Sequence, residues 1–110
     1  MSDFDDRKKA FENKFQHDET LRFKVASRMG KLLGLWAAGE MGITGAEAEA
    51  YAREVVAADL DKPGHEDLLD KIEKDFQARN VSVTRHRLQR EMESSLATAR
   101  EQIMNADKPA

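Results

Sequence analysis

The amino-acid sequence predicts an all-α protein, a four-helix bundle-like domain preceded by an N-terminal amphipathic or partly disordered arm. Apolar residues recur at the three- and four-residue spacing of helices along nearly the whole chain. Only Val81-Ser82-Val83 alternates as a strand does, and this run is too short to pair. Short segments rich in glycine, proline or polar residues divide the helical pattern, which is typical of an antiparallel bundle with short connections.

The bulk properties of the chain fit one small domain. It has 110 residues, no cysteine and a formal net charge of −3. The lack of cysteine rules out disulfides and thiolate metal sites, and no run approaches the roughly 18 apolar residues of a membrane span. A nucleic-acid role usually shows a basic excess, which is missing here. We therefore expect a cytoplasmic protein without direct membrane insertion and without a nucleic-acid partner.

The first predicted unit is the arm, residues 1–19. Phe4, Phe11 and Phe15 are seven and four residues apart, so on a helix they share one face. The residues between them are charged, amide or alanine. Two acid-first pairs stand at the spacing that stabilises a helix: Asp3 with Arg7, and Asp5 with Lys9.

A break in the apolar pattern separates the arm from the first helix of the bundle. Continuing the aromatic face seven residues beyond Phe15 reaches Arg22, so the phase changes between Gln16 and Thr20. This predicts a hinge, with Asp18 or Thr20 able to cap the next helix.

The bundle is predicted over residues 20–104, with 105–110 as a flexible tail. Its first helix ends in the glycine-rich segment 39–45, and Thr44 with Glu47 has the spacing of a capping box for the second. The apolar positions of the first helix form two neighbouring stripes: Leu21, Val25, Leu32 and Trp36, and Phe23, Ala26, Leu33 and Ala37.

The second predicted helix is rich in alanine and should allow a neighbouring helix to approach closely; it ends at Asp61 to Gly64, and its apolar positions are Ala48, Tyr51, Ala52, Val55 and Val56. The third stops near Asn80, and Ser82 is positioned to cap the fourth. The core positions of the last two helices are Leu68, Leu69, Ile72 and Phe76, then Leu88, Met92, Leu96, Ala99 and Ile103.

Few residues suggest catalytic or metal chemistry. His65 with Glu66 and Asp67 could be imagined as metal ligands, but no second histidine stands four residues on, and an acidic first turn of a helix is the favoured interpretation. Tyr51 is expected to be a packed residue with its hydroxyl at the surface. We expect no enzyme activity, no metal and no cofactor.

A basic cluster opens the fourth predicted helix and invites a phosphate-binding interpretation. The favoured alternative is that it pairs with the acidic segment 59–75 of the same chain. Gly30 to Gly34 is not a phosphate loop, since it lacks the lysine-serine/threonine ending and lies within a helical stripe. The cluster comprises Arg79, Arg85, His86, Arg87 and Arg90.

The arm is the remaining candidate for function, and composition leaves two interpretations open. Its three phenylalanines could fold back and complete the core of the bundle. They could also be anchors presented to a groove on another protein, as amphipathic helices often are.

The run FDDRKKAFENKFQHDETLRFKV, followed by KLLGLWAA and a GITG-type turn, resembles the zeta-type inhibitor subunit of the alphaproteobacterial F-type ATP synthase. The resemblance is strongest from Phe4 through Ala38 and covers most of the chain. It implies a small four-helix protein that associates with the membrane peripherally, through the ATP synthase.

The resemblance also implies an inhibitor whose N-terminal segment enters a catalytic interface of the ATPase head and reaches towards the central stalk. The segment would block rotation in the hydrolysis direction while permitting synthesis. The partner-binding residues implied are the apolar anchors Phe4, Phe11 and Phe15 and the polar or charged Asp3, Asp5, Asp6, Arg7, Lys8, Lys9, Lys14 and His17.

An alternative from another class is a small nucleotide-sensing or regulatory helical bundle. Weak nucleotide binding would then occur between helices, where basic side chains meet phosphates. The residues predicted for this role are Arg28, Lys31, Arg85, Arg87 and Arg90.

Overall fold

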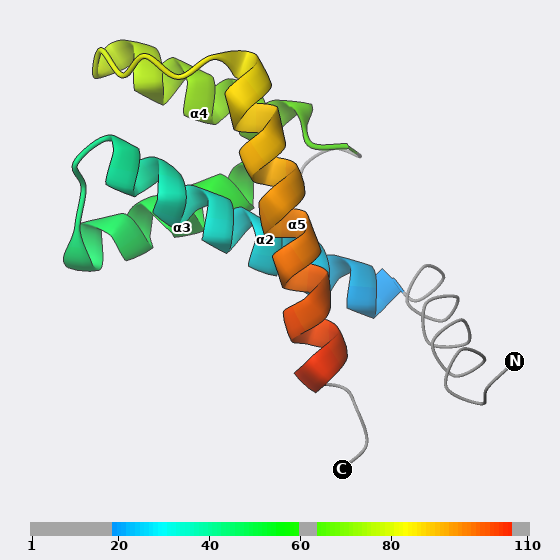
Figure 1. Cartoon of the computed structure of the whole chain (residues 1–110). Coiled ribbons are helices and arrows are strands. Elements are labelled where there is room, and N and C mark those ends of the chain that lie inside the picture. The colour runs from blue at the N-terminus through cyan, green and yellow to red at the C-terminus, as the bar shows by residue number, and fades with distance from the viewer. Residues whose placement is uncertain (1–18, 60–63, 107–110) are drawn as a thin grey trace, which may run out of the picture.

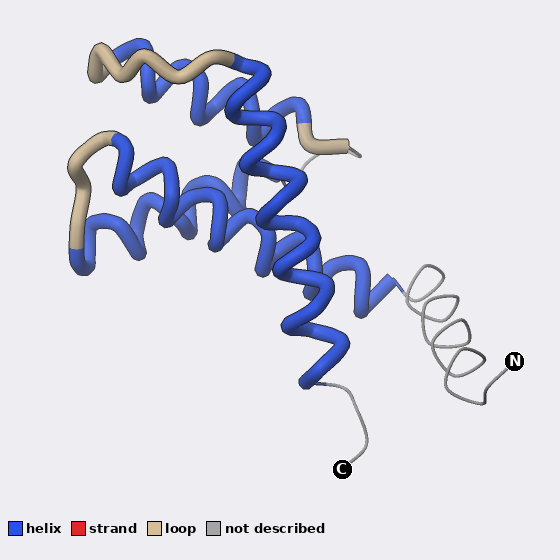
Figure 2. The backbone as a smooth tube through the Cα atoms, in the orientation of Figure 1, coloured by secondary structure: helices blue, strands red, loops and turns tan. Residues whose placement is uncertain are grey.

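The computed structural model describes residues 19–59 and 64–106, and within these ranges it contains four helices and no strand. Figures 1 and 2 show the helices and the loops that join them. The all-α fold predicted from the sequence is confirmed. None of these four helices is long and apolar enough to cross a membrane. The helices are α2 (Glu19–Glu40), α3 (Gly45–Asp59), α4 (Glu66–Ala78) and α5 (Arg85–Ala106).

Helices α2 and α3 form an antiparallel hairpin (Figure 2). Two backbone hydrogen bonds make the turn between them a Schellman motif. The Ile43 N–H donates to the Ala38 carbonyl at 2.8 Å, and the Gly42 N–H donates to the Gly39 carbonyl at 3.1 Å. Gly42 has a φ of 75°, which only a residue without a Cβ adopts at little cost. The predicted helix stop within 39–45 is confirmed.

The hairpin is held by an unusually close contact between small residues. A Cβ built on Gly34 would lie 2.7 Å from the Ala52 Cα, and one built on Gly30 would lie 3.0 Å from the Val56 Cγ2. The two glycines and their two partners are each four residues apart, so they form matching rows on facing helices. The close approach expected of the alanine-rich helix is therefore present.

Helix α4 ends in a second Schellman motif, and α5 begins later than predicted. Asn80 has a φ of 58°, and the Val81 N–H donates to the Phe76 carbonyl at 2.8 Å. The N-cap of α5 is Thr84, whose Oγ1 accepts the Arg87 N–H at 3.1 Å. The prediction of Ser82 as the cap was wrong. The chain stays non-helical for two more residues, which lets both Val81 and Val83 pack against the core.

Helix α5 crosses α2 steeply instead of running beside it along its whole length (Figure 1). The core lies where the four helices meet, and its largest fully buried side chains are Met29, Leu33, Val55, Leu68, Leu69, Ile72, Phe76 and Leu88. One predicted stripe position is wrong: Phe23 is 56% exposed. Leu21 and Val25, two residues before and after it, are buried, so Phe23 lies on the opposite side of α2 and faces solvent.

Replacing Gly34 with alanine is expected to destabilise the protein. The added methyl group would overlap the backbone of Ala52 and force the helices apart, at about 1–3 kcal/mol, although alanine favours the helix by about 1 kcal/mol. Urea unfolding should therefore show a net loss. Gly39→Ala is the matched control, because no atom lies within 4 Å of its added Cβ and its stability should not fall. Equal stability of Gly34→Ala and the unsubstituted protein would contradict the close contact between α2 and α3.

Candidate functional site

The predicted arm residues lie outside the part of the chain that the structure describes, which begins at Glu19. Their proposed roles therefore stay predictions. The residues concerned are Asp3, Phe4, Asp5, Asp6, Arg7, Lys8, Lys9, Phe11, Lys14, Phe15 and His17.

The basic residues predicted to meet a nucleotide are distributed over two helices. Arg28 on α2 donates from Nη1 to Gln102 Oε1 of α5 at 3.4 Å. Lys31, also on α2, lines a shallow hollow of about 320 Å³ against α3. Arg90 is exposed on α5. Nucleotide binding by this set stays a prediction, and two of its members, Arg85 and Arg87, are held by carboxylates.

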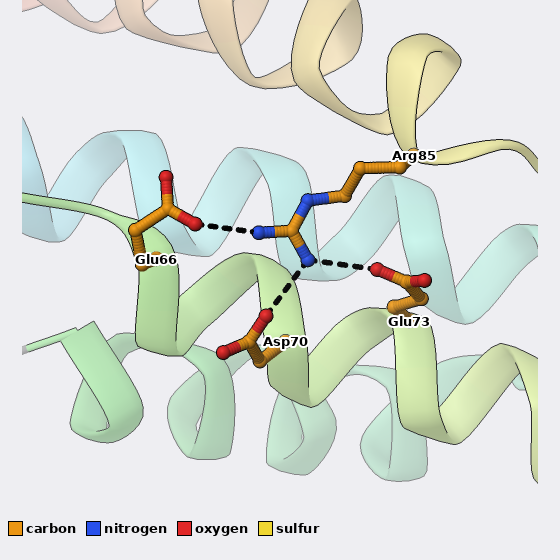
Figure 3. Close-up of polar contacts among 4 residues, drawn as sticks. All are labelled: Glu66, Asp70, Glu73 and Arg85. Atoms are coloured by element: carbon orange, nitrogen blue, oxygen red, sulfur yellow. Dashed lines mark hydrogen bonds and ion pairs between the residues drawn. The ribbon is translucent and has the colours of Figure 1, made fainter.

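Arg85 lies against three carboxylates of α4, as Figure 3 shows. Its Nη2 is 2.7 Å from Glu66, and its Nη1 is 2.8 Å from Asp70 and 2.7 Å from Glu73. These acids stand at i, i+4 and i+7 and share one face of α4. The hydrogen bond that Arg85 donates to Asp70, followed by the one it donates to Glu73, raises the pKa of its guanidinium above the ordinary value. Pairing of the basic cluster with the acidic 59–75 segment is confirmed for this residue.

Arg87 joins α5 to the aromatic part of the core. Its Nε lies 3.2 Å from Glu91 Oε1, and its guanidinium carbon lies 5.9 Å from the centroid of the Trp36 ring. Trp36 in turn meets Phe76 edge to face, with ring centroids 5.9 Å apart. Arg87 therefore has a structural role between α5 and α2.

Tyr51 is buried, and its hydroxyl donates to Asp75 Oδ2 at 2.7 Å. Burial is the largest cause that raises the pKa of this phenol, and the hydrogen bond to Asp75 adds to it. The packed position predicted for Tyr51 is confirmed, with a carboxylate as the partner of its hydroxyl.

An unpredicted pair of titratable side chains joins the end of α3 to the start of α4. His65 Nδ1 lies 3.0 Å from both carboxylate oxygens of Asp59, whose side chain is 5% exposed. Burial raises the pKa of Asp59, and the hydrogen bond to His65 acts in the opposite direction. His65 occupies the N-cap position of α4 without a side-chain capping bond. The only signal in the sequence was an acid six residues before a histidine.

An open hollow of about 550 Å³ lies beside the start of α2, where the arm joins the bundle. Its floor is apolar, formed by Val25, Ala26 and Leu96. Arg22, His65 and Arg100 line it as well, and Gly64 completes the lining. Sequence reasoning missed Arg22 and Arg100 as site residues, although Arg22 stands where the aromatic face of the arm would continue.

Comparison with protein families decides what the chain is. A model of the family "ATPase inhibitor subunit zeta" matches residues 1–102. The chain belongs to this family. This confirms the resemblance inferred from the sequence. The four helices and the hollow described above therefore belong to an inhibitor subunit associated with an ATPase.

One solved structure supports the fold of this zeta-family protein. A protein studied by NMR in solution is 37% identical, with a TM-score of 0.69, and the match covers 78% of this chain and 98% of that chain. A comparison with curated proteins gives no match.

Arg85→Met is expected to lower the free energy of unfolding of the zeta-family protein by about 1 kcal/mol, because three neighbouring carboxylates lose their shared cation. The loss should shrink at about 1 M salt, where charges are screened over about 3 Å. Urea unfolding at low and high salt measures both effects. Arg90→Met on the same helix is the control and should change little. A loss that does not depend on salt would show that packing of the Arg85 stem matters instead.

The Asp59 carboxyl should make stability fall as pH rises. Because its pKa in the folded protein lies above the ordinary 3.8, the folded state keeps a proton that the unfolded chain has released between those two values. The free energy of unfolding therefore decreases as pH rises through that window. Asp59→Asn should remove this contribution while its amide oxygen still accepts from His65. Unfolding in urea across the acidic range tests this, with exposed Glu49→Gln as control; an unchanged slope for Asp59→Asn would refute the assignment.

Proposed function

We propose that the protein inhibits ATP hydrolysis by the F-type ATPase by inserting residues 3–17 into a catalytic interface of the ATPase head. The observation that carries the proposal is the single family match over residues 1–102, in which the pattern of an inhibitor subunit includes both the arm and the helices. The arm then acts at the interface, and the bundle docks on the outside of the head.

The chemistry of the arm supports insertion. Phe4, Phe11 and Phe15 on one helical face suit a hydrophobic groove, and the charged residues between them fix the register. Burying three phenylalanines supplies about 5–9 kcal/mol. Ordering some fifteen residues costs about 15–30 kcal/mol. The arm therefore gains its order from contacts with a partner more than from its own few apolar residues.

The charges of the bundle also favour the arm as the inhibitory element. Arg85 and Arg87 already pair with acids of the same chain, so they add little to a new interface. A helical segment of fifteen residues spans about 22 Å, long enough to pass through an interface towards the central stalk. Held there, it obstructs rotation in the hydrolysis direction. The protein is thereby cytoplasmic and peripherally membrane-associated through the synthase.

Deletion of residues 2–17 should abolish inhibition of ATP hydrolysis by the isolated ATPase head. The assay compares the intact and the shortened protein over a range of concentrations. Phe11→Ala and Phe15→Ala in the intact chain should each raise the half-inhibitory concentration about ten- to a hundredfold, the equivalent of one buried phenylalanine.

The melting temperature provides the control. It should hardly change in either phenylalanine variant, because these side chains act on the partner; a large drop would place them in the core of the bundle. Equal inhibition by the intact and the shortened protein would contradict the proposed role of residues 3–17.

A further inference from the structure

The hollow beside the start of α2 combines an apolar floor with basic side chains. Arg22 on α2 and Arg100 on α5 line it from two helices, and Leu96, four residues before Arg100, lines it as well. Among residues 19–59 and 64–106, neither arginine has a hydrogen-bond or ion-pair partner. Both differ in this from Arg85, which three carboxylates hold.

The histidine that lines the hollow, His65, already has an acidic partner. His65 faces the carboxylate of Asp59, which is buried behind it. The charge that attracts a ligand to the hollow therefore comes chiefly from Arg22 and Arg100. These two cations favour a ligand that carries negative charge. The apolar floor selects a second feature, a compact hydrophobic group next to that anion.

The chain itself contains a segment with this pairing of features. Residues 3–6 read Asp-Phe-Asp-Asp, one aromatic ring flanked by three carboxylates. We propose that, in the free protein, this segment docks in the hollow, with Phe4 on the floor and the aspartates against Arg22 and Arg100. The hollow is thus a resting site for the tip of the arm.

The connection is long enough for this contact. Thirteen residue steps separate Asp6 from Glu19, which extend to about 45 Å and, if helical, span about 20 Å. Arg22 and Val25 lie in the first two turns of α2, close in sequence to Glu19, where the arm joins this helix. Tethering places the tip at an effective concentration in the millimolar range. A contact with an intrinsic Kd of about 1 mM is therefore occupied about half of the time.

Such docking has a regulatory consequence, which rests on the proposed inhibition. Phe4 cannot lie in the hollow and in a groove of the ATPase head at once. The head therefore competes with the resting site, and the resting site sets a threshold for inhibition. The contact within the free protein is tested without the ATPase, so its failure is separable from a failure of the inhibition assay.

Paramagnetic broadening in the free protein tests the contact. Since the chain has no cysteine, Ser2→Cys allows a single nitroxide label next to the tip of the arm. Amide signals of Val25 and Leu96 should broaden at least twofold more than those of Gly42 and Asn80, the two helix-end turns. Reducing the nitroxide should restore all signals.

Charge reversal identifies the groups responsible. Arg22→Glu with Arg100→Glu should abolish the selective broadening. Arg53→Glu with Arg90→Glu, two exposed arginines elsewhere on the bundle, should preserve it. Because substitutions in the bundle could disturb folding, Asp5→Lys with Asp6→Lys provides a second test that leaves every described residue unchanged, and it too should abolish the broadening.

Several outcomes would overturn the proposal. Uniform broadening over the bundle would mean that the tip has no preferred site. Broadening transferred from labelled chains to unlabelled, isotope-enriched chains in a mixture would assign the hollow to a second copy. An absence of broadening at Val25 and Leu96, together with shifts of these amides on addition of ADP, would assign it to a nucleotide. Persistence of broadening in the Asp5→Lys, Asp6→Lys variant would exclude the carboxylates as the ligand.

Discussion

The contact between Gly34 and Ala52 is the constraint on which the fold depends. With no side chain on Gly34 and only a methyl group on Ala52, the backbones of α2 and α3 approach until a Cβ would lie 2.7 Å from the facing Cα. The resulting hairpin presents Met29 and Leu33 from one helix and Val55 from the other as one surface. Helices α4 and α5 pack on that surface. The close contact gains favourable dispersion energy, but the interface between α2 and α3 cannot accept larger side chains without strain.

Ionic contacts also help to hold helix α4 in place. The acidic face of α4 would repel itself without Arg85, and one guanidinium serves all three of its acids. On the opposite side of the same helix, Tyr51 of α3 donates to Asp75, and Lys71 of α4 lies 3.7 Å from Glu54 of α3. Helix α4 is therefore attached by apolar burial along one stripe and by ionic contacts on its flanks. These contacts act on orientation more than on stability, because most of the acids remain partly exposed to water.

Much of this arrangement can be predicted from residue patterns. Helical periodicity and glycine positions predicted the four helices of residues 19–59 and 64–106, the helix ends within 39–45 and near Asn80, and the close approach of the alanine-rich helix. Local signals failed where tertiary packing decided the outcome. Thr84 replaced Ser82 as a cap because burial of Val81 and Val83 outweighs a capping bond two residues earlier.

The candidate sites, too, could not be predicted from local sequence patterns alone. A periodic pattern identifies a face of one helix, whereas the hollow joins Arg22 to Arg100, residues 78 positions apart that meet because α5 crosses α2. The Asp59–His65 pair likewise depends on the angle between two helices, which no local pattern contains. The inhibitory role proposed for the arm rests on the family resemblance, because three aromatic residues on one face suit a core and a partner equally well.

Trp36 has a consequence for spectroscopy. It is the single tryptophan of the chain, and its ring lies between Phe76 of α4 and the guanidinium of Arg87 of α5 while belonging to α2. The tryptophan fluorescence of the protein therefore originates from one point where three helices meet. Separation of either α4 or α5 from the hairpin changes the polarity around the indole, so the emission spectrum reports the docking of both helices without an added label.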